Sequence, residues 1–295
     1  MDDMSETRPP LATISAWPSV ERPIMVMCLD GWIDAGAAAA GALGALTAST
    51  QSTLVATFDS DELIDFRARR PTLRIVNGVD EQLRWPEITV HSSVNRTGRT
   101  VLTLSGPEPD MQWRRFTTEV VALASRLEVE LVVGLGAFPA PVPHTRPVRL
   151  VGTSPNPELA ARVGVLPASI EVPSGVQGAL EVAFGEASIP AVGLWARVPH
   201  YVAAMPYPAA SAALLEGLGR IAEIEVDSKA LHASASVTNQ QIGQLLAGSD
   251  EHTALVRQLE EQADQELMSG AADFGDLPSG DELAAELERF LRGET

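Results

Sequence analysis

The chain of 295 residues contains a single cysteine, Cys28, and this scarcity excludes two kinds of structure. One thiol cannot form a disulfide within the chain, and it cannot build the thiolate clusters that hold metals. Cys28 lies inside the apolar run from Ile24 to Leu29. We therefore interpret it as a small buried hydrophobic residue.

Lysine is equally scarce, because Lys229 is the only one and the other twenty basic residues are arginines. A phosphate-binding P-loop needs a lysine after its glycines, and Lys229 follows no such loop. Acidic residues outnumber basic ones by 39 to 21, which gives a formal net charge of −18. Because nucleic-acid affinity rests on Lys and Arg contacts to phosphates, we expect no DNA or RNA partner.

Long apolar stretches are also missing. None of the apolar runs reaches the length that a membrane crossing needs. The first ten residues, MDDMSETRPP, are acidic and lack the apolar core of a secretory signal. We expect a cytoplasmic protein without a membrane partner.

Complete catalytic motifs are absent from the sequence. It contains no H-E-x-x-H, C-x-x-C, G-x-S-x-G or G-x-G-x-x-G motif. Gly36 and Gly41 have the spacing of a P-loop, but Ala42 and Leu43 stand where that loop needs Lys and Ser or Thr. We expect no cofactor and no metal, and we assign no catalytic residue, although a Ser-His-Asp set from distant positions stays open.

Short apolar runs and helix-like segments alternate along most of the chain. The runs lack strict alternation, which is typical of strands covered on both faces. We expect strands at Ile24 to Leu29, Thr53 to Phe58, Ile88 to His91, Thr100 to Leu104, Glu130 to Leu135, Val148 to Thr153 and Ala191 to Ala196. We expect helices at Asp34 to Ala48, Pro109 to Leu127, Glu158 to Val163, Gly175 to Ala187 and Ala209 to Ile221. This order predicts an α/β fold with a mainly parallel sheet.

A change of pattern after Ser228 divides the chain. Residues 20–228 are predicted to form the α/β domain, after a flexible N-terminal segment at 1–19. Residues 229–268 show apolar spacings of three and four, at Val237 to Leu246 and His252 to Leu267, which predict helices lying on the α/β body. Residues 269–295 are predicted to be a linker and an acidic amphipathic tail helix.

The tail helix has a defined apolar face. From Asp250 onward, thirteen acidic residues stand against three arginines, so the segment as a whole is expected to be solvated. Within it, apolar side chains fall on one side of a helix, at Leu283, Leu287, Phe290 and Leu291. We expect this face to bind a protein partner or the body of the chain itself.

Two pairs of aspartates follow the first two predicted strands. Asp30 and Asp34 precede an Ala/Gly-rich helix that Asp34 can cap, at the end of the sheet where open α/β folds bind ligands. Alternatively, the small residues only let this helix lie close to the sheet or to another helix. Asp59 and Asp61 could hold a hard cation. Alternatively, Asp59 and Glu62 form a capping box for a helix over Leu63 to Arg69, which we favour.

The third candidate group lies in the proline-rich loop that ends at residue 147. His144 and Arg146 are residue types suited to binding a carboxylate or a phosphate. A purely structural role for this loop is the alternative. One hypothesis joins the three groups in a ligand site at one rim of the sheet, made of Asp30, Asp34, Asp59, Asp61, His144 and Arg146.

Four motifs in a fixed order carry a family resemblance. They are DGWIDAG at 30–36, FDSDEL at 58–63 with RRP at 69–71, GLGAFP at 134–139 with HTR at 144–146, and LWARVPHY at 194–201. Together they resemble the proteasome assembly chaperone family, in its actinobacterial branch. The resemblance spans residues 20–225, and the tail from Leu277 to Leu291 is similar to that branch too.

The resemblance implies a fold, a form of assembly and a role. The fold is a three-layer α/β/α sandwich similar to nucleoside phosphorylases, and the assembly is a homo-oligomer, for instance a trimer. The role is to guide proteasome subunits into rings, and it carries over no catalytic residue. Relatives that dock on proteasome rings end in a hydrophobic-Tyr-X tail, whereas this chain ends in RGET. This departure argues against insertion of the tail into a proteasome pocket.

The sequence therefore leaves two candidate functions. The first is a non-enzymatic assembly or interaction factor that acts as a homo-oligomer and binds proteasome subunits or another protein. The alternative is a small-molecule-binding protein or a hydrolase- or phosphorylase-like enzyme, with its pocket at the carboxyl end of the sheet.

Overall fold

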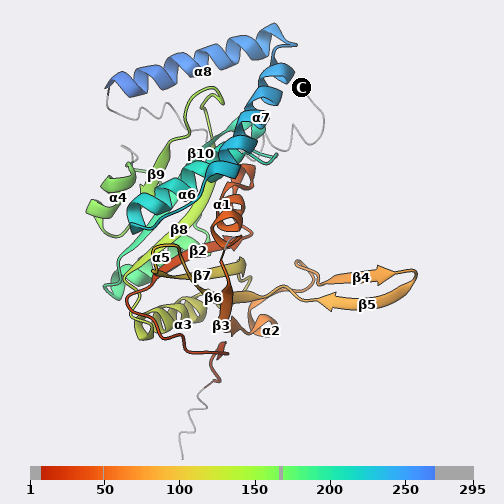
Figure 1. Ribbon diagram of the computed structural model, residues 1–295, viewed down its shortest axis with the longest axis vertical. Coiled ribbons are helices and arrows are strands. Elements are labelled where there is room, and N and C mark those ends of the chain that lie inside the picture. The colour runs from red at the N-terminus through yellow and green to blue at the C-terminus, as the bar shows by residue number, and fades with distance from the viewer. Residues whose placement is uncertain (1–7, 49, 166–168, 270–295) are drawn as a thin grey trace, which may run out of the picture.

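The computed structural model describes residues 8–48, 50–165 and 169–269 and contains one eight-stranded sheet (Figure 1). Across the sheet the order is β1-β3-β6-β7-β2-β8-β10-β9. The strands are β1 (Ala12–Ile14), β2 (Ile24–Asp30), β3 (Ser52–Phe58), β6 (Ile88–Val94), β7 (Thr100–Pro107), β8 (Leu131–Ala140), β9 (Leu150–Thr153) and β10 (Ala191–Pro199). All seven strands expected from the sequence are present.

The four strands at the centre of the sheet are parallel. Strand β2 pairs in parallel with β7 and β8, and β8 pairs in parallel with β10. Antiparallel pairs complete both edges, with β6, β3 and β1 beyond β7, and with β9 beyond β10. The predicted α/β fold is confirmed, with its parallel strands at the centre of the sheet.

Strand β2 shows why the apolar runs lack alternation. Ile24 and Val26 belong to the core on one face of the sheet, and Met25 and Met27 belong to the core on the other. All four side chains are fully or almost fully buried. A strand covered on both faces needs apolar residues at every position, as the sequence predicts.

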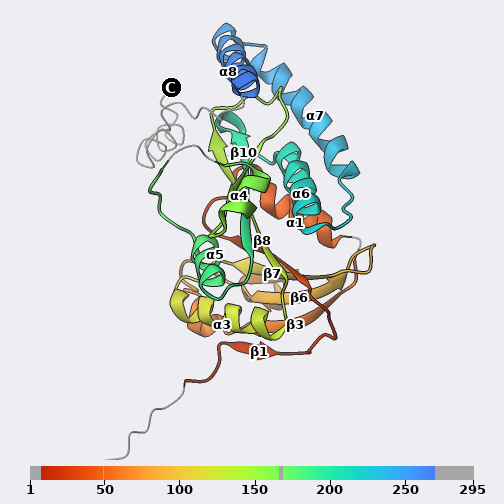
Figure 2. The ribbon, with the colours of Figure 1, turned by 90° about the vertical axis from the view of Figure 1, so that its left-hand side faces the viewer.

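Helices cover both faces and form the outer layers of the sandwich (Figure 2). Helices α1 (Ala38–Thr47) and α6 (Pro208–Ala222) pack on one face, through residues such as Ala42 and Leu214. Helices α3 (Trp113–Arg126) and α5 (Val176–Glu186) pack on the other, through Phe116 and Leu180. Shorter elements are η1 (Ala35–Ala37), α2 (Ser60–Leu63), α4 (Pro157–Val163) and η2 (His200–Val202).

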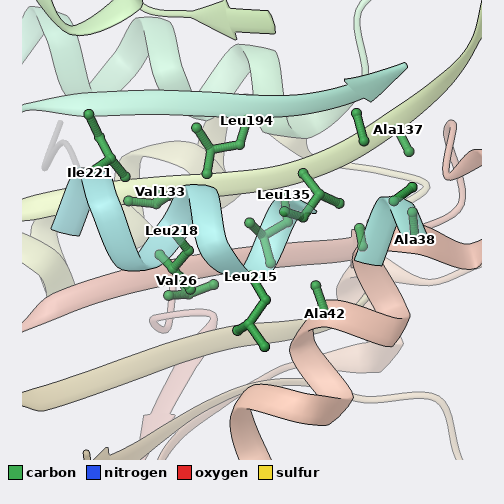
Figure 3. Packing of buried hydrophobic residues seen from close by; sticks show 14 of the residues in the cluster. Val26, Ala38, Ala42, Val133, Leu135, Ala137, Leu194, Leu215, Leu218 and Ile221 are labelled. Carbon is green, nitrogen blue, oxygen red and sulfur yellow. The ribbon is translucent and has the colours of Figure 1, made fainter. Parts of the chain in front are cut away.

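The Ala/Gly-rich helix α1 lies close against α6. Ala38 and Ala42 are fully buried beside Leu215 of α6 (Figure 3). A Cβ atom at Gly41 would lie 2.4 Å from Oγ of Ser211 on α6. Larger side chains on α1 would separate the two helices, so the composition of this segment serves packing.

The C-terminal helices are α7 (Lys229–Leu246) and α8 (Asp250–Ser269). They match the two helices expected after residue 228. Helix α7 packs along α6, and α8 lies at one end of the molecule (Figure 1). The part of the chain that the structure describes contains no helix long and apolar enough to cross a membrane.

Two features of the fold were not expected from the sequence. Residues 1–19 were expected to be flexible, but strand β1 within them pairs with β3, and Leu11 is 1% exposed. Strands β4 (Thr72–Val76) and β5 (Val79–Arg84) form a separate antiparallel hairpin that projects from the body (Figure 1). We call residues 72–84 the β4–β5 arm. The helix expected over Leu63 to Arg69 was wrong, because α2 ends at Leu63 and the chain turns toward the arm.

Candidate functional site

Asp34 caps the start of helix α1, as its position before that helix predicts. Its carboxylate accepts hydrogen bonds from the backbone N–H groups of Ala39 at 2.7 Å and Ala40 at 3.1 Å. Burial nevertheless raises the pKa of Asp34 above its usual value. Burial also raises the pKa of the neighbouring Cys28 thiol to about 12, so Cys28 stays protonated. The residue packs against the core but is only partly buried, whereas the sequence predicts full burial.

Asp59 caps α2 instead of pointing into a shared site. Its side chain accepts from the backbone N–H groups of Asp61 at 2.9 Å and Glu62 at 3.3 Å. The Glu62 side chain does not complete a capping box, because it accepts a hydrogen bond from the Gln112 amide. Asp61 is exposed in the first turn of the helix. Only the capping half of the expected motif is therefore confirmed.

Arg69 joins the loops at this edge of the sheet. Its guanidinium donates to Oδ1 of Asp110 at 3.1 Å and to the backbone carbonyl of Asp30 at 3.2 Å. Gly31 leaves the room for this contact, because a Cβ atom there would lie 2.5 Å from Arg69. The loops after β2 and α2 thus meet through an arginine, and the carboxylates of Asp59 and Asp61 stay at the start of α2.

His144 is buried between the body and helix α7. Its ring is buried, with Nδ1 2.9 Å from the hydroxyl of Tyr201, and its backbone N–H donates to the same hydroxyl at 2.8 Å. The ring faces Gly243 of α7, and burial lowers the pKa of His144 so that the imidazole stays neutral. A neutral buried imidazole is a poor site for an anion.

Arg146 is paired with α8. Its Nε and Nη2 atoms donate to the two carboxylate oxygens of Asp264, both at 2.8 Å, and Nη1 lies 3.3 Å from Glu260. This bidentate pair lowers the pKa of Asp264. The anion that Arg146 binds in this structure is therefore a carboxylate of the same chain.

A buried ion pair extends the contact between α8 and the body. Nη1 of Arg197, on β10, lies 2.9 Å from Oε2 of Glu266, and Nη1 of Arg149 lies 3.2 Å from the same oxygen. The Arg197 side chain is 3% exposed and that of Glu266 is 10% exposed. A cleft of about 90 Å³ lies beside this pair and is lined by Arg146, Tyr207 and Leu267 among others. Carboxylates of helix α8 thus pair with arginines of the body, one on β10 and two in the loop before β9.

The six residues expected to form one ligand site therefore lie in three separate contacts. These are the α1 cap with Asp30 beside it, the α2 cap, and the contacts of α7 and α8 with the body. The tail residues Leu283, Leu287, Phe290 and Leu291 lie outside the described residues. Among the described residues, no group of three or more His, Cys, Asp or Glu side chains is arranged to hold a metal ion.

A cavity that the sequence did not reveal lies between α5 and strand β9. Its volume is about 550 Å³, and it is lined by Thr153, Ser154, Pro155, Gly178, Glu181, Val182, Gly185 and Glu186. Glu181 forms a buried wall of this cavity, with 5% of the residue exposed. We call it the Glu181 pocket.

Glycines of the sheet make room for the polar side chains at this pocket. Gly134 and Gly193 are direct partners on β8 and β10. A Cβ atom at Gly134 would lie 2.5 Å from the Gln177 amide, and one at Gly193 would lie 2.4 Å from Oε1 of Glu181. Two polar side chains of α5 can therefore rest on the sheet where apolar ones would be usual.

Hydrogen bonds hold the Glu181 carboxyl group in place. The Thr153 hydroxyl donates to Oε2 of Glu181 at 2.8 Å, and the Gln177 amide donates to Oε1 at 3.3 Å. The indole N–H of Trp195 donates to the Thr153 hydroxyl at 2.9 Å. Burial raises the pKa of Glu181 to about 7 against these hydrogen bonds, which favour the anion. A perturbed carboxyl group in a cavity is a common feature of functional sites.

Replacing Glu181 by glutamine should change how stability depends on pH. The folded pKa is raised from 4.5 to about 7, so the wild type loses stability as pH rises through this interval, by about 3 kcal/mol in total. Glu181→Gln removes this loss. Urea unfolding should give similar free energies for both proteins at pH 5 and a more stable variant at pH 8. Glu186→Gln, exposed on the same helix, is the control, and parallel curves for Glu181→Gln and wild type would contradict the burial argument.

Sequence reasoning missed this pocket because its residues are widely separated. Thr153, Glu181 and Trp195 lie on three elements, and of the three only Trp195 belongs to a motif, LWARVPHY. The available signal was the pair of glycines in strands β8 and β10, since glycine inside a strand marks a close approach of another group.

Comparison with known proteins gives a family and several structural relatives. The sequence profile of the PAC2 family matches residues 28–246. No curated protein matches. A protein of unknown function from Corynebacterium glutamicum has a similar structure, with 31% identity and a TM-score of 0.82, covering 87% of this chain and 98% of that one.

Two further similar structures are of proteins whose names refer to the proteasome. A proteasome-assembly chaperone homologue from Mycobacterium tuberculosis is 36% identical, with a TM-score of 0.74, covering 79% of this chain and 99% of that one. The archaeal proteasome activator PbaB from Pyrococcus furiosus shares the fold at 16% identity and a TM-score of 0.61, covering 79% of this chain and 97% of that one. The match to these structures extends over nearly their whole length.

Proposed function

The chain belongs to the PAC2 family, and we propose that it acts as a non-enzymatic assembly or interaction factor, a cytoplasmic homo-oligomer that binds proteasome subunits. The description of the Mycobacterium tuberculosis relative as a proteasome-assembly chaperone homologue supports this role. The polar residues of the family motifs support it as well, because Asp34, Asp59 and Arg146 make structural contacts.

The observation that carries the proposal is the position of the exposed apolar side chains. Many of them lie on elements that project from the sandwich, namely the arm and the C-terminal helices (Figure 1). On α7 and α8 these are Val237, Leu245, Leu267 and Met268, with exposures of 55%, 73%, 61% and 89%. Large apolar side chains exposed on projecting elements are available for contact with a protein partner, and this supports the proposed role.

An assembly assay with purified proteasome α- and β-subunits from the source organism tests the role. If the chain is an assembly factor, it should bind free subunits and increase the rate at which rings appear on native gels. The finished particle should contain fewer copies of the chain than of the proteasome subunits. An unchanged rate together with no binding to either subunit would contradict the proposal.

The tail enters this proposal as a partner-binding segment. A chain that ends at residue 269 keeps all described helices and strands. If the apolar face of Leu283, Leu287, Phe290 and Leu291 binds the partner, this shortened chain should fold but bind subunits more weakly. Equal binding by the two chains would exclude the tail from the contact.

The Glu181 pocket favours a second candidate function, the binding of a small cationic amine. Two carboxyl groups, Glu181 and Glu186, line the cavity, and its lining residues include no basic side chain. Calorimetric titration with agmatine would test this function. Binding that is lost in Glu181→Gln would support it, and equal heats from wild type and variant would contradict it.

A further inference from the structure

The side chains that line the Glu181 pocket offer hydrogen-bond acceptors and no free donor. With both glutamates of the lining ionised, only the hydroxyls of Thr153 and Ser154 carry a polar hydrogen. The Thr153 hydroxyl donates to Oε2 of Glu181 at 2.8 Å, and the Ser154 hydroxyl donates to the backbone carbonyl of Ala191 at 2.6 Å. Both hydrogens are therefore used within the protein, and a polar ligand must bring its own donors.

Acceptor positions stay open at the Glu181 carboxylate. Each of its oxygens accepts one hydrogen bond, from Thr153 or from Gln177, and a carboxylate oxygen has room for two. The Thr153 oxygen accepts from the Trp195 indole at 2.9 Å and keeps one lone pair. Two positions on the carboxylate and one on the hydroxyl therefore remain for a ligand.

The Glu181 carboxyl group has no charged partner among the described residues. Its hydrogen bonds come from a hydroxyl and an amide, and the residue is only 5% exposed to water. A buried carboxylate that has only neutral donors is disfavoured, which is why burial raises its pKa. A cation bound in the pocket would neutralise this charge.

A primary ammonium group matches these acceptors. It carries one positive charge and three N–H donors on a compact head, one donor for each open position. A guanidinium has five donors in a rigid planar fork, so some of them would find no acceptor at this wall. Because a buried donor without an acceptor weakens binding, the wall favours an ammonium group over a guanidinium.

The rest of the lining suits an unbranched aliphatic chain. Pro155 and Val182 are apolar, and Gly178 and Gly185 present only backbone on the α5 side. Methylene groups that are buried against such walls add to the affinity. Val182 and Glu186 are exposed, so the pocket opens at the surface of the protein. A side chain that belongs to a second protein can therefore enter it.

The lysine of the chain itself lies far from this pocket. Lys229 is the only lysine in the sequence, and it begins α7. Helix α7 packs along α6, on the face of the sheet opposite α5 (Figure 2). A pocket selective for lysine is therefore left free for another protein, although the chain has twenty arginines.

We propose that the Glu181 pocket binds a lysine side chain of a partner protein, with the ammonium group on Glu181 and Thr153 and the aliphatic stem along Pro155 and Val182. This inference rests on the proposed protein-binding function and names the group of the partner that is recognised. The formal net charge of −18 attracts lysine-rich surfaces over a longer range, and the pocket adds a specific contact.

Titration with an amino-acid derivative tests the pocket directly. Nα-acetyl-lysine methylamide should bind in an NMR titration at pH 8, where most of Glu181 is ionised. Glu181→Gln places an amide donor at the ammonium position and should raise the dissociation constant on the order of 10-fold or more. The arginine derivative should bind the wild type on the order of 10-fold more weakly. Absence of binding, or equal binding of the two derivatives, would overturn the inference.

Two further variants separate recognition from charge and stability. Thr153→Val removes one acceptor from the pocket and should also weaken binding. Glu21→Gln removes one negative charge from the exposed segment before β2 and should leave binding unchanged. A loss in Glu21→Gln as large as in Glu181→Gln would show that net charge alone binds the probe. Because Glu181→Gln is expected to be more stable than the wild type at pH 8, unfolding does not explain its weaker binding.

Purified proteasome subunits test whether the lysine belongs to a protein. Acetylation removes the charge of subunit lysines, so acetylated subunits should bind the wild type on the order of 10-fold more weakly. Native subunits should bind Glu181→Gln with a similar loss, and the two changes together should weaken binding no more than either alone.

The outcomes distinguish this inference from the proposed function. Native subunits that bind wild type and Glu181→Gln equally would overturn the inference and leave the proposed function intact. Native subunits that do not bind the wild type would contradict the proposed function, and the lysine derivative would still decide the inference. If agmatine binds and the lysine derivative does not, the pocket belongs to free amines and the inference is overturned.

Discussion

Replacing Glu266 by glutamine should release helix α8 from the body. The Arg197 side chain is 3% exposed, and the substitution removes a full negative charge from its partner. Removing one member of a buried ion pair costs about 3–5 kcal/mol, because the other charge stays in a medium that solvates it poorly. Undocking of α8 would relieve that cost by letting water reach the guanidinium. We therefore expect local opening of α8, measured as faster amide hydrogen exchange along residues 250–269.

Two variants give this prediction its controls. Glu260→Gln removes a carboxylate from the more exposed pair with Arg146, where the side chains are 26% and 33% exposed, and should cost less than about 1 kcal/mol. The double variant Arg197→Met/Glu266→Met replaces the ion pair by apolar side chains and should restore much of the protection of α8. Unchanged exchange in Glu266→Gln would show that the pair does not hold the helix.

Gly106→Ala should destabilise the whole fold by about 3 kcal/mol or more. Gly106 has a φ of +133°, which L-residues rarely adopt, and a Cβ atom there would lie 2.2 Å from the Glu87 carbonyl oxygen. The colliding atoms belong to the backbone at the start of β6, so a change of rotamer cannot relieve the contact. Urea unfolding measures the effect as a lower midpoint.

Gly98→Ala is the matched control for this substitution. Gly98 has a φ of +81°, and a Cβ atom there would have no other heavy atom within 4 Å beyond its chain neighbours. Gly98→Ala should therefore lower the free energy of unfolding only by the cost of placing alanine at a positive φ, about 1 kcal/mol. Equal losses for the two variants would show that the contact with Glu87 contributes nothing, and that β6 can shift where the chain returns from the arm.

The sandwich was predictable because its strands carry a strong local signal. A strand such as β2, buried on both faces, must be apolar at every position, and this requirement is visible in Ile24 to Leu29. The arm was missed although Asn77-Gly78 between alternating apolar residues is a strong hairpin signal. Its strands lie outside the core, so they do not form the continuous apolar runs that identified the others.

The contacts at the functional surfaces were less predictable, because they join distant parts of the chain. His144 and Arg146 stood out by residue type, but the partner of Arg146 is Asp264, 118 positions later. An arginine suited to bind an external anion and one that binds its own C-terminal helix have the same local sequence. Glu181 likewise acquires its raised pKa from burial against β9 and β10, which only the assembled sheet provides.

The mass of the wild-type protein in solution tests the central claim most directly. Sedimentation equilibrium over a range of concentrations, at low and high salt, measures whether copies of this 31.3 kDa chain associate. We predict a discrete multiple of that mass, because the proposed assembly factor is a homo-oligomer. A single chain at every concentration would contradict an assembly factor built from copies of itself.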